Sequence, residues 1–425
     1  MSDPGARGRL PVLFVTAFVD MVGLTMILPL LPFYAKELGA SATVVGLLIA
    51  AFSLAQLVVA PVWGRFSDRY GRRPAILAGL LVTAVAYVLF AFAGSLALLL
   101  LSRIIQGVGG GTIGVVQAYV ADASPLDRRT KSLGWLSAVT SLGAVAGPAF
   151  GSLMIAVGGR SAPGLAAAAL AALVAVFAQR FLRESRLLTT TGSRTAAPAT
   201  TGRAAIGRIA THWREPASRL VWIYAVAIGA FYGTAQTAPL LLAQRFAITE
   251  HNIGYFIMYL GGLGVVIRSF LLGPIVDRLG EARLSRLGIC CLAAGLAATG
   301  LARSYPVLGL GFTLMPLGTA FLFPCVTGLL SRVVSAAERG LYMGVQHTFG
   351  GVSRVAFPVA AGMAMDRFGV GVPFWMAGLL VLLTLPLTRG MAGFLTAESQ
   401  LAPAELAIAS ADVTGEMPVA PPRPS

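Results

Sequence analysis

Three arginines and one acid lie well inside long apolar runs of this chain, where charged groups are rare. The acid is Asp20, and the arginines are Arg103, Arg268 and Arg354. A charge in the hydrocarbon region is costly, so such residues face a bundle interior or a water-filled cavity and mark ion or substrate pathways. A carboxylate there can bind and release a proton, and Arg103 is its natural counter-charge. Alternatively, helix hydroxyls satisfy the Asp20 carboxylate, which then serves only packing.

The interior arginines outnumber the interior acid, so a cavity among these segments should repel cations and favour anionic or zwitterionic solutes. Arg354 lies deep in its apolar run, whereas Arg268 is close enough to one end for its guanidinium to reach the interface. His347 is either a hydrogen-bonding group or a proton site. The candidate substrate-binding residues are Gln117, Tyr232, Gln236, Tyr259, Arg268, His347 and Arg354.

The segments that carry these residues are those of a membrane protein. The chain is 56% apolar and only 12% charged, with a mean hydropathy of +0.80, whereas a soluble domain is about a quarter charged. Apolar runs of about 18 residues or more can cross a hydrocarbon layer about 30 Å thick. The composition excludes a soluble enzyme and predicts an all-α integral membrane protein. Its twelve predicted helices are residues 10–34, 43–63, 75–93, 96–121, 132–157, 163–182, 219–242, 252–275, 284–302, 305–331, 341–365 and 371–393.

The order of these spans predicts two six-helix bundles, at residues 1–182 and 219–393. A linker rich in Arg, Thr, Ala and Gly (183–218) joins them, and a tail too poor in large apolar residues to fold (394–425) follows. With the N-terminus, the even-numbered loops and the C-terminus on one side, that side holds 24 of the 32 Lys and Arg residues, against 5 opposite and 3 within spans. This bias predicts a multi-pass protein of the inner (cytoplasmic) membrane with both termini cytoplasmic. The net charge of +15 therefore does not indicate a nucleic-acid partner.

The two halves contain an internal repeat, because Gly, Asp, Arg and Pro recur at a near-constant offset of 209 or 210 residues. Structural duplicates related by an axis along the membrane normal place a substrate site near the midplane between them. The recurrences are Gly64, Asp68, Arg69 and Gly71 as Gly273, Asp277, Arg278 and Gly280, Pro29 as Pro239, Gly134 as Gly344, and Pro148 as Pro358.

The loop between the second and third spans, GRFSDRYGRRP at residues 64–74, resembles the G-x-x-x-D-R-x-G-R-R loop signature of the major facilitator superfamily. Its glycines let two helix ends approach, and Asp68 can accept hydrogen bonds from an arginine or a helix N-terminus. The resemblance implies a switch that latches the helix ends in one conformation and releases them in the other. Its expected members are Gly64, Asp68, Arg69, Gly71, Arg72 and Asp122, with Asp277 and Arg278 in the second half.

The fifth span resembles the antiporter signature G-x8-G-x3-G-P-x-x-G-G of that family's proton-coupled drug exporters, with Ser152 in place of the last glycine. Small residues at every fourth position let neighbouring backbones touch. The pattern indicates either antiport machinery or a tight packing seam with no bearing on antiport. The matching residues are Gly134, Gly143, Gly147, Pro148 and Gly151.

The first span, DMVGLTMILPLLP from Asp20, resembles the D-x-x-G-x5-P-x-L-P opening of the tetracycline-exporter branch. Arg103 matches an R-x-x-x-G element that the family associates with proton transfer. The resemblance thus implies proton coupling through Asp20 and Arg103. Tetracycline exporters also carry an acid on the ninth span and a histidine on the eighth, and this chain has neither. The resemblance therefore implies the exporter class and not tetracycline as the substrate.

Together the residues and the resemblance predict a secondary transporter, not an enzyme, that exports a small organic solute or drug in exchange for protons, as in multidrug efflux and antibiotic resistance. An alternative stays open: the protein is an anion or zwitterion carrier of the same fold, either an importer or a facilitator, whose intramembrane arginines bind the substrate. No metal pattern or ATP-binding loop is found, so an ion gradient or the substrate's own gradient must supply the energy. The proton is the expected coupling ion, sodium is not excluded by residue type, and no other cofactor is expected. The expected partners are the solute and the lipid bilayer, and the expected unit is a monomer.

Overall fold

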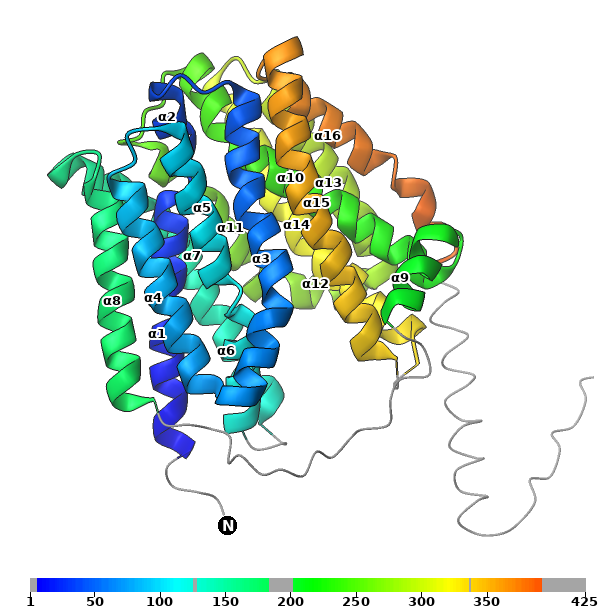
Figure 1. Cartoon of the computed structure of the whole chain (residues 1–425). Coiled ribbons are helices and arrows are strands. Elements are labelled where there is room, and N and C mark those ends of the chain that lie inside the picture. Colours follow the sequence, from blue (N-terminus) through cyan, green and yellow to red (C-terminus); the bar gives the residue numbers. More distant parts are fainter. Residues whose placement is uncertain (1–5, 125–127, 183–201, 336–337, 392–425) are drawn as a thin grey trace, which may run out of the picture.

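The computed structural model describes residues 6–124, 128–182, 202–335 and 338–391, and within these ranges the regular structure is helical (Figure 1). Ten helical segments are long and apolar enough to cross a membrane. The polar-rich helix at Arg339–Phe368 and the shorter apolar segment Val372–Thr388 complete the set. Each predicted span thus corresponds to a helical segment, and the all-α membrane class is confirmed. The predicted tail at 394–425 lies outside the described residues.

The first half is built from eight helices and the second from the remainder of the chain. The first-half helices are α1 (Ala6–Ile27), α2 (Leu31–Glu37), α3 (Ala42–Tyr70), α4 (Arg72–Ala91), α5 (Leu96–Gly110), α6 (Ile113–Ala123), α7 (Arg129–Gly158) and α8 (Ala162–Phe181). The later helices are α9 (Gly202–Thr211), α10 (Pro216–Phe246), α11 (Ile253–Val266), the π-helix η1 (Ile267–Leu271), α12 (Leu272–Leu279), α13 (Glu281–Leu301), α14 (Tyr305–Val333), α15 (Arg339–Phe368), α16 (Val372–Leu382) and the 3₁₀ helix η2 (Leu385–Thr388).

Three spans that the sequence predicts as continuous are interrupted. The first breaks between α1 and α2 at Pro29, which cannot continue the helical hydrogen bonding. The fourth breaks between α5 and α6 after three glycines, Gly109–Gly111, because glycine has low helix propensity. The eighth passes through η1, a π-helical segment that contains Arg268. Broken helices free backbone groups, and in membrane proteins such groups are found where they line a cavity or are buried in protein.

The predicted loop at residues 64–74 is mostly helix. α3 continues to Tyr70 and α4 begins at Arg72, so the connection is Gly71 alone, whose φ of 104° favours glycine. Gly280, with φ 75°, makes the equivalent connection between α12 and α13. The loop prediction was wrong because the polar end of a helix can extend beyond the apolar run that hydropathy detects.

The predicted linker contains the short helix α9. It buries Ala205 and Ile209 against the second half, beside α10 and α15. Arg208 Nε donates to Glu215 Oε2 at 2.8 Å, and this hydrogen bond together with the glutamate's charge raises the pKa of Arg208 above its ordinary value. Residues 183–201 of the linker lie outside the described residues.

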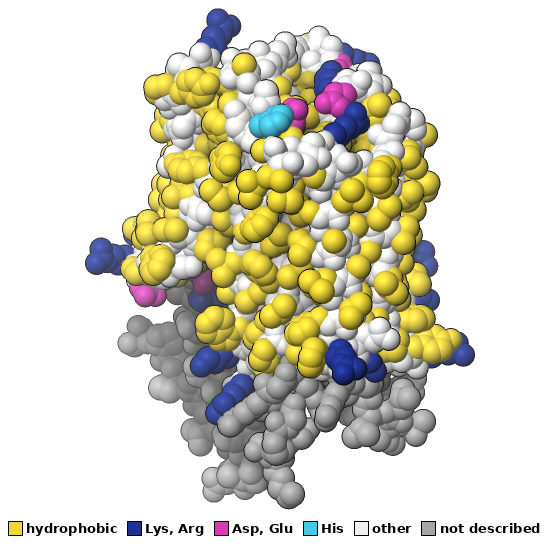
Figure 2. Space-filling view, turned by 90° about the vertical axis from the view of Figure 1, so that its left-hand side faces the viewer, with side chains coloured by type: hydrophobic (Ala, Val, Ile, Leu, Met, Phe, Trp, Pro, Cys, Tyr) yellow, Lys and Arg dark blue, Asp and Glu magenta, His cyan; other side chains and the backbone are white. Residues whose placement is uncertain are grey.

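The outer surface is apolar over its middle, and charged side chains gather toward the two ends (Figure 2). Large apolar side chains such as Val58, Leu173 and Phe270 are more than 60% exposed. A belt of this kind matches the hydrocarbon layer of a bilayer. The chain is therefore a multi-pass membrane protein whose surface contacts lipid.

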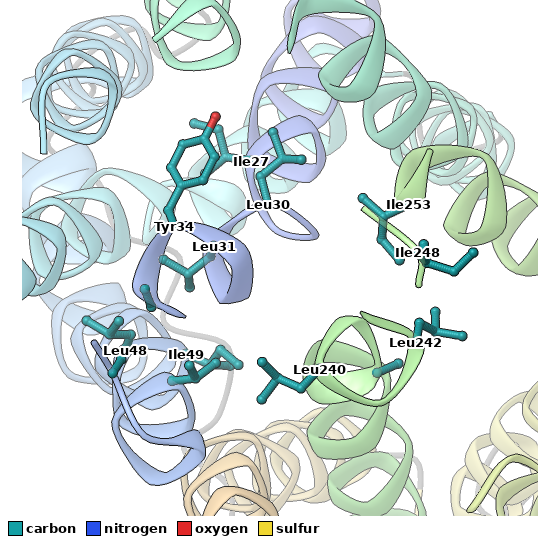
Figure 3. Packing of buried hydrophobic residues seen from close by; sticks show 14 of the residues in the cluster. Ile27, Leu30, Leu31, Tyr34, Leu48, Ile49, Leu240, Leu242, Ile248 and Ile253 are labelled. Atoms are coloured by element: carbon teal, nitrogen blue, oxygen red, sulfur yellow. The ribbon is translucent and has the colours of Figure 1, made fainter. Parts of the chain in front are cut away.

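The two halves are joined at one end of the bundle. We call the end where α8 finishes and α10 begins the linker side, and the opposite end the far side. Buried apolar clusters in the described chain belong to the first half, to the second half, or, on the far side, to both. Figure 3 shows the shared cluster, in which both halves contribute large apolar side chains. Its labelled members are Ile27, Leu30, Leu31, Tyr34, Leu48 and Ile49 from the first half, and Leu240, Leu242, Ile248 and Ile253 from the second.

Candidate functional site

Asp20 lines a cavity of about 630 Å³ inside the first half, with walls from α1, α4, α6 and α7. It is the one ionisable residue in that lining, as far as the chain is described. The hydroxyls of Thr16 and Thr140 in the same lining donate to carbonyl oxygens of their own helices, at 2.8 and 3.0 Å. No described residue forms an ion pair or a hydrogen bond with the Asp20 carboxylate. This geometry does not support the alternative in which helix hydroxyls satisfy Asp20.

Arg103 on α5 is fully buried beside, but outside, this cavity. One guanidinium nitrogen donates to Gln106 Oε1, and its Cζ lies 4.7 Å from the centroid of the Phe52 ring. Its Nε and the other terminal nitrogen have no hydrogen-bond partner in the described structure. Arg103 and Asp20 do not form an ion pair in this conformation, so the predicted counter-charge of Asp20 is not in contact with it.

A second cavity, of about 240 Å³, lies between the halves and contains His347 and Arg354 of α15. On its other side are Ser53 and Gln56 of α3 and the α5–α6 break. Gln56 Nε2 donates to the Gly110 carbonyl at 3.1 Å, which holds the amide against the break. The two cavities adjoin at this break, because Ile113 and Gly114 line both.

The predicted substrate-binding residues fall into separate places. Gln117 lines the Asp20 cavity, and His347 and Arg354 line the second. The other four line neither cavity. On α10, Tyr232 packs against the far-side cluster and Gln236 is half-buried. Tyr259 is exposed, and its hydroxyl forms a hydrogen bond with the Thr313 hydroxyl at 2.9 Å. Arg268 is exposed on η1. Apolar runs locate residues along a span but do not specify the rotation of each helix.

Gln56 is the site residue that sequence reasoning missed. It is the one carboxamide in the apolar run 43–63, so its position carried a signal of the same kind as Gln117. Ser137 and Thr140 of α7, which face the Asp20 cavity, lie within the antiporter-like segment. That segment was interpreted from the sequence only through its glycines and Pro148, so these two hydroxyl groups were not identified.

The polar cluster at the linker side of the first half is centred on Arg72. Arg72 lies 3.0 Å from Asp68 and 3.1 Å from Asp122, and it donates to the Ser67 hydroxyl at 2.8 Å. The Arg69 guanidinium lies over the Tyr70 ring. Arg72 thus joins the ends of α3, α4 and α6, and the predicted proximity of Asp122 to the signature is present.

The second-half copy of this cluster is different. Asp277 and Arg278 on α12 are exposed, and within the described residues neither forms an ion pair. Arg332 pairs with Glu281 at 2.7 Å, and these two residues lie 210 and 209 positions after Asp122 and Arg72. The repeat therefore preserves the backbone turn at Gly280 and one ion pair with its charges exchanged, but not the pairing of Asp68.

The glycines of the fifth span bring α7 against α1, the helix that carries Asp20. A Cβ on Gly143 would lie 2.6 Å from the Phe18 carbonyl oxygen, and one on Gly147 would lie 2.6 Å from that of Val22. Gly151 faces the Met26 carbonyl in the same way, whereas Gly134 has nothing within 4 Å. Small residues thus permit backbone contact along three turns.

The same segment of α7 also contacts the second half. The Pro148 carbonyl faces Gly254 of α11, and its repeat partner, the Pro358 carbonyl of α15, faces Gly46 of α3. The two seams between the halves are therefore built alike. α7 therefore contacts both α1, the helix that bears Asp20, and α11 of the second half.

Two polar contacts cross these seams near the far side. The Asp366 carboxylate, at the end of α15, accepts hydrogen bonds from the backbone N–H groups of Ala42 and Thr43 at 2.9 and 2.8 Å. Ser152 Oγ donates to the Glu250 carbonyl at 2.8 Å and accepts from the Gly254 N–H at 3.0 Å. Ser152, which replaces a glycine of the signature, therefore bonds to the second half.

Two helical bundles with connected cavities that hold ionisable groups inside the membrane define a membrane transport protein. Residues 13–302 and 220–404 match the Major Facilitator Superfamily, and the chain belongs to this family. The protein is a secondary transporter and not an enzyme, as the sequence indicated.

Several known proteins are similar to the chain over most of its length. It is 29% identical to multidrug resistance protein 2 of Bacillus subtilis over 401 residues, covering 89% of this chain and 93% of that protein. It is 26% identical to the class B tetracycline resistance protein of Escherichia coli, covering 86% and 89%. The crystal structure of the human organic anion transporter MFSD10 is 27% identical, with a TM-score of 0.65, covering 91% and 100%.

Proposed function

We propose that the protein exports a small organic solute or drug across the cytoplasmic membrane in exchange for protons. The observation that carries the proposal is the unpartnered Asp20 carboxylate, the one ionisable group described in the lining of a cavity large enough for a drug-sized molecule. The similarity to a multidrug and a tetracycline resistance protein supports it. The charge distribution supports an orientation with the linker side and both termini in the cytoplasm.

Alternating access supplies the mechanism. When the far side is open, Asp20 takes a proton from outside. When the halves close on the far side, as here, Asp20 releases the proton toward the linker side, and the solute enters the cavity. Arg103 acts on the protonation of Asp20 through its charge, and Gln117 contacts the solute. α7 couples rocking of the halves to α1 through Gly143, Gly147 and Gly151.

The linker-side cluster controls which face is open. Arg72, Asp68 and Asp122 fasten three helix ends within the first half, and Gly64, Arg69, Gly71, Asp277 and Arg278 belong to the surfaces that meet when the linker side closes. One chain encloses both cavities, so the unit is a monomer. The proton is the coupling ion and no other cofactor takes part.

The experiment is a proton-flux measurement in proteoliposomes that hold an imposed pH gradient and an internal pH dye. Cationic, neutral and anionic solutes are added to wild type, to Asp20→Asn, and to Glu37→Gln as a matched loss of a carboxylate. Glu37 is a far-side residue paired with Arg160 at 2.7 Å, outside both cavities. We expect at least one solute to dissipate the gradient in wild type and Glu37→Gln but not in Asp20→Asn. Full solute-driven proton flux in Asp20→Asn would remove Asp20 from the mechanism.

A second candidate function is that of an anion or zwitterion carrier, importing or facilitating, without proton exchange. It is favoured by Arg354, which lines the second cavity together with His347, and by the similarity to a human organic anion transporter. In the same liposomes, a labelled anion that crosses while no solute moves protons would select this function over antiport.

A further inference from the structure

The cavity between the halves concentrates positive charge and hydrogen-bond donors. Its lining holds Arg354, His347, Gln56 and Ser53, and no acid is found in it among the described residues. His347, Gly351 and Arg354 follow one another at intervals of four and three residues, so they share one face of α15. Between them, Gly351 lets the Leu57 side chain of α3 approach α15, with its Cδ1 2.9 Å from the position that a Cβ on Gly351 would take.

Among the described residues, Arg354 has no hydrogen-bond or ion-pair partner. Its Nε is buried and has no hydrogen-bond partner, and no described acid lies within ion-pair distance of its guanidinium. A guanidinium inside the membrane needs a counter-charge or water to offset its lost hydration. Arg268 of the second half is exposed on η1 and lines neither cavity.

The size of the cavity indicates what the missing counter-charge is. A volume of about 240 Å³ is smaller than a typical drug-sized site of 300–1,000 Å³, so it suits one polar group of a larger ligand. The larger, mostly apolar Asp20 cavity adjoins it at Ile113 and Gly114, where a glycine with nothing within 4 Å of its Cβ position leaves the passage clear. A ligand can therefore place its apolar body in one cavity and an anionic group in the other.

We propose that the cavity between the halves binds the carboxylate of an amphipathic substrate, with Arg354 as the main recognition residue. The planar guanidinium fork matches a carboxylate in a bidentate pair, and His347 and Gln56 supply further hydrogen bonds. This rests on the proposed transport function and narrows its substrates to amphipathic carboxylates, including those that also carry a positive charge. Since α15 belongs to the second half and Gln56 to the first, the bound carboxylate bridges the halves.

The test compares two dyes that differ in one group. Rhodamine 110 carries a free carboxylate, and rhodamine 123 is its methyl ester. Equilibrium binding of each is measured by fluorescence anisotropy with the full chain in lipid nanodiscs. This binding measurement needs no proton gradient. It can therefore support the carboxylate site even if proton coupling is disproved, and it can disprove the site even if proton coupling is supported. Arg354→Gln removes the guanidinium, Arg354→Lys keeps the charge without the fork, and Arg268→Gln is the matched control.

We expect wild type and Arg268→Gln to bind rhodamine 110 about tenfold more tightly than the ester, as a charge-assisted pair implies. Arg354→Gln should lose this preference while still binding the ester, which also shows that the variant is folded. Arg354→Lys should keep only part of it. The proposal is overturned if wild type fails to bind rhodamine 110, binds both dyes equally, or loses its preference equally in Arg268→Gln.

Discussion

The contact between Asp366 and α3 makes a quantitative prediction about the conformational equilibrium. The carboxylate accepts backbone hydrogen bonds from Ala42 and Thr43 and a third from the Thr43 hydroxyl at 2.6 Å. The carboxylate belongs to the second half, and its donors belong to the first half. The donors lie at the N-terminus of α3, where a negative charge is favourable. The carboxylate and its donors separate when the far side opens. Asp366→Asn should therefore destabilise the conformation in which the far side is closed.

The magnitude follows from what the substitution removes. Asparagine keeps one acceptor oxygen but loses the charge and the second acceptor. Hydrogen bonds to charged groups contribute about 1.5–3 kcal/mol in protected sites, and exposure to solvent reduces this toward about 1 kcal/mol. Asp366 is exposed, so we expect a loss of about 1 kcal/mol. The ratio of far-side-closed to far-side-open molecules should then fall about fivefold.

The assay is the labelling rate of a single cysteine by a membrane-impermeant maleimide added from the far side. Ile49→Cys places the thiol in the cluster shared by both halves, where Ile49 is 1% exposed. The native Cys290, Cys291 and Cys325 are first replaced by alanine. Because the thiol reacts only in molecules that have opened, its labelling rate follows the open population when opening is fast. Asp366→Asn should raise the rate about fivefold.

Glu37→Gln is the control, because it removes a far-side carboxylate whose ion pair with Arg160 lies within the first half. It should leave the labelling rate unchanged. An unchanged rate in Asp366→Asn, or an equal increase in both variants, would refute the assignment of Asp366 as a contact that holds the far side closed.

Two further substitutions test the seams. Gly147→Ala should lower the free energy of unfolding by about 1–3 kcal/mol, because its Cβ would meet the Val22 carbonyl at 2.6 Å. Gly134→Ala should be neutral or slightly stabilising, since its Cβ meets nothing within 4 Å. Thermal unfolding in detergent compares the stability of the two variants. An equal loss of stability in both would contradict the packing argument. Ser152→Ala removes both hydrogen bonds to the second half, so Ile49→Cys should label several-fold faster. An unchanged rate would show that Ser152 does not hold this seam.

Much of the architecture could be predicted from local sequence alone. Apolar runs locate the spans because crossing a hydrocarbon layer imposes a length and a composition on each helix separately. Asp20 was identifiable because an acid in such a run stands out. Close packing along Gly143, Gly147 and Gly151 was expected, since a glycine removes the side chain that keeps two backbones apart.

The tertiary structure alone decided which groups meet. The rotation of each helix, which hydropathy does not specify, puts Arg103 against Gln106 and Phe52 instead of Asp20. It also places Tyr259 and Arg268 outside both cavities. The halves repeat in sequence, but only the structure shows that the Arg72–Asp122 ion pair of the first half recurs in the second as Glu281–Arg332, with the charges exchanged.

The contacts between the halves were the least predictable, because they join residues that are between 98 and 324 positions apart. In the sequence alone, Ser152 is only a departure from a glycine pattern. Its position opposite Gly254 in the structure shows that its hydroxyl forms a hydrogen bond with the second half. Asp366 likewise reads as an ordinary charged residue at the end of a span. Its role depends on the backbone N–H groups at the start of α3, which packing of the two halves brings to it. The sequence by itself determined the helices, the membrane and the buried acid, since these follow from local composition. Packing decided the cavities, their charges and the closed far side, since these depend on how the helices are rotated and paired.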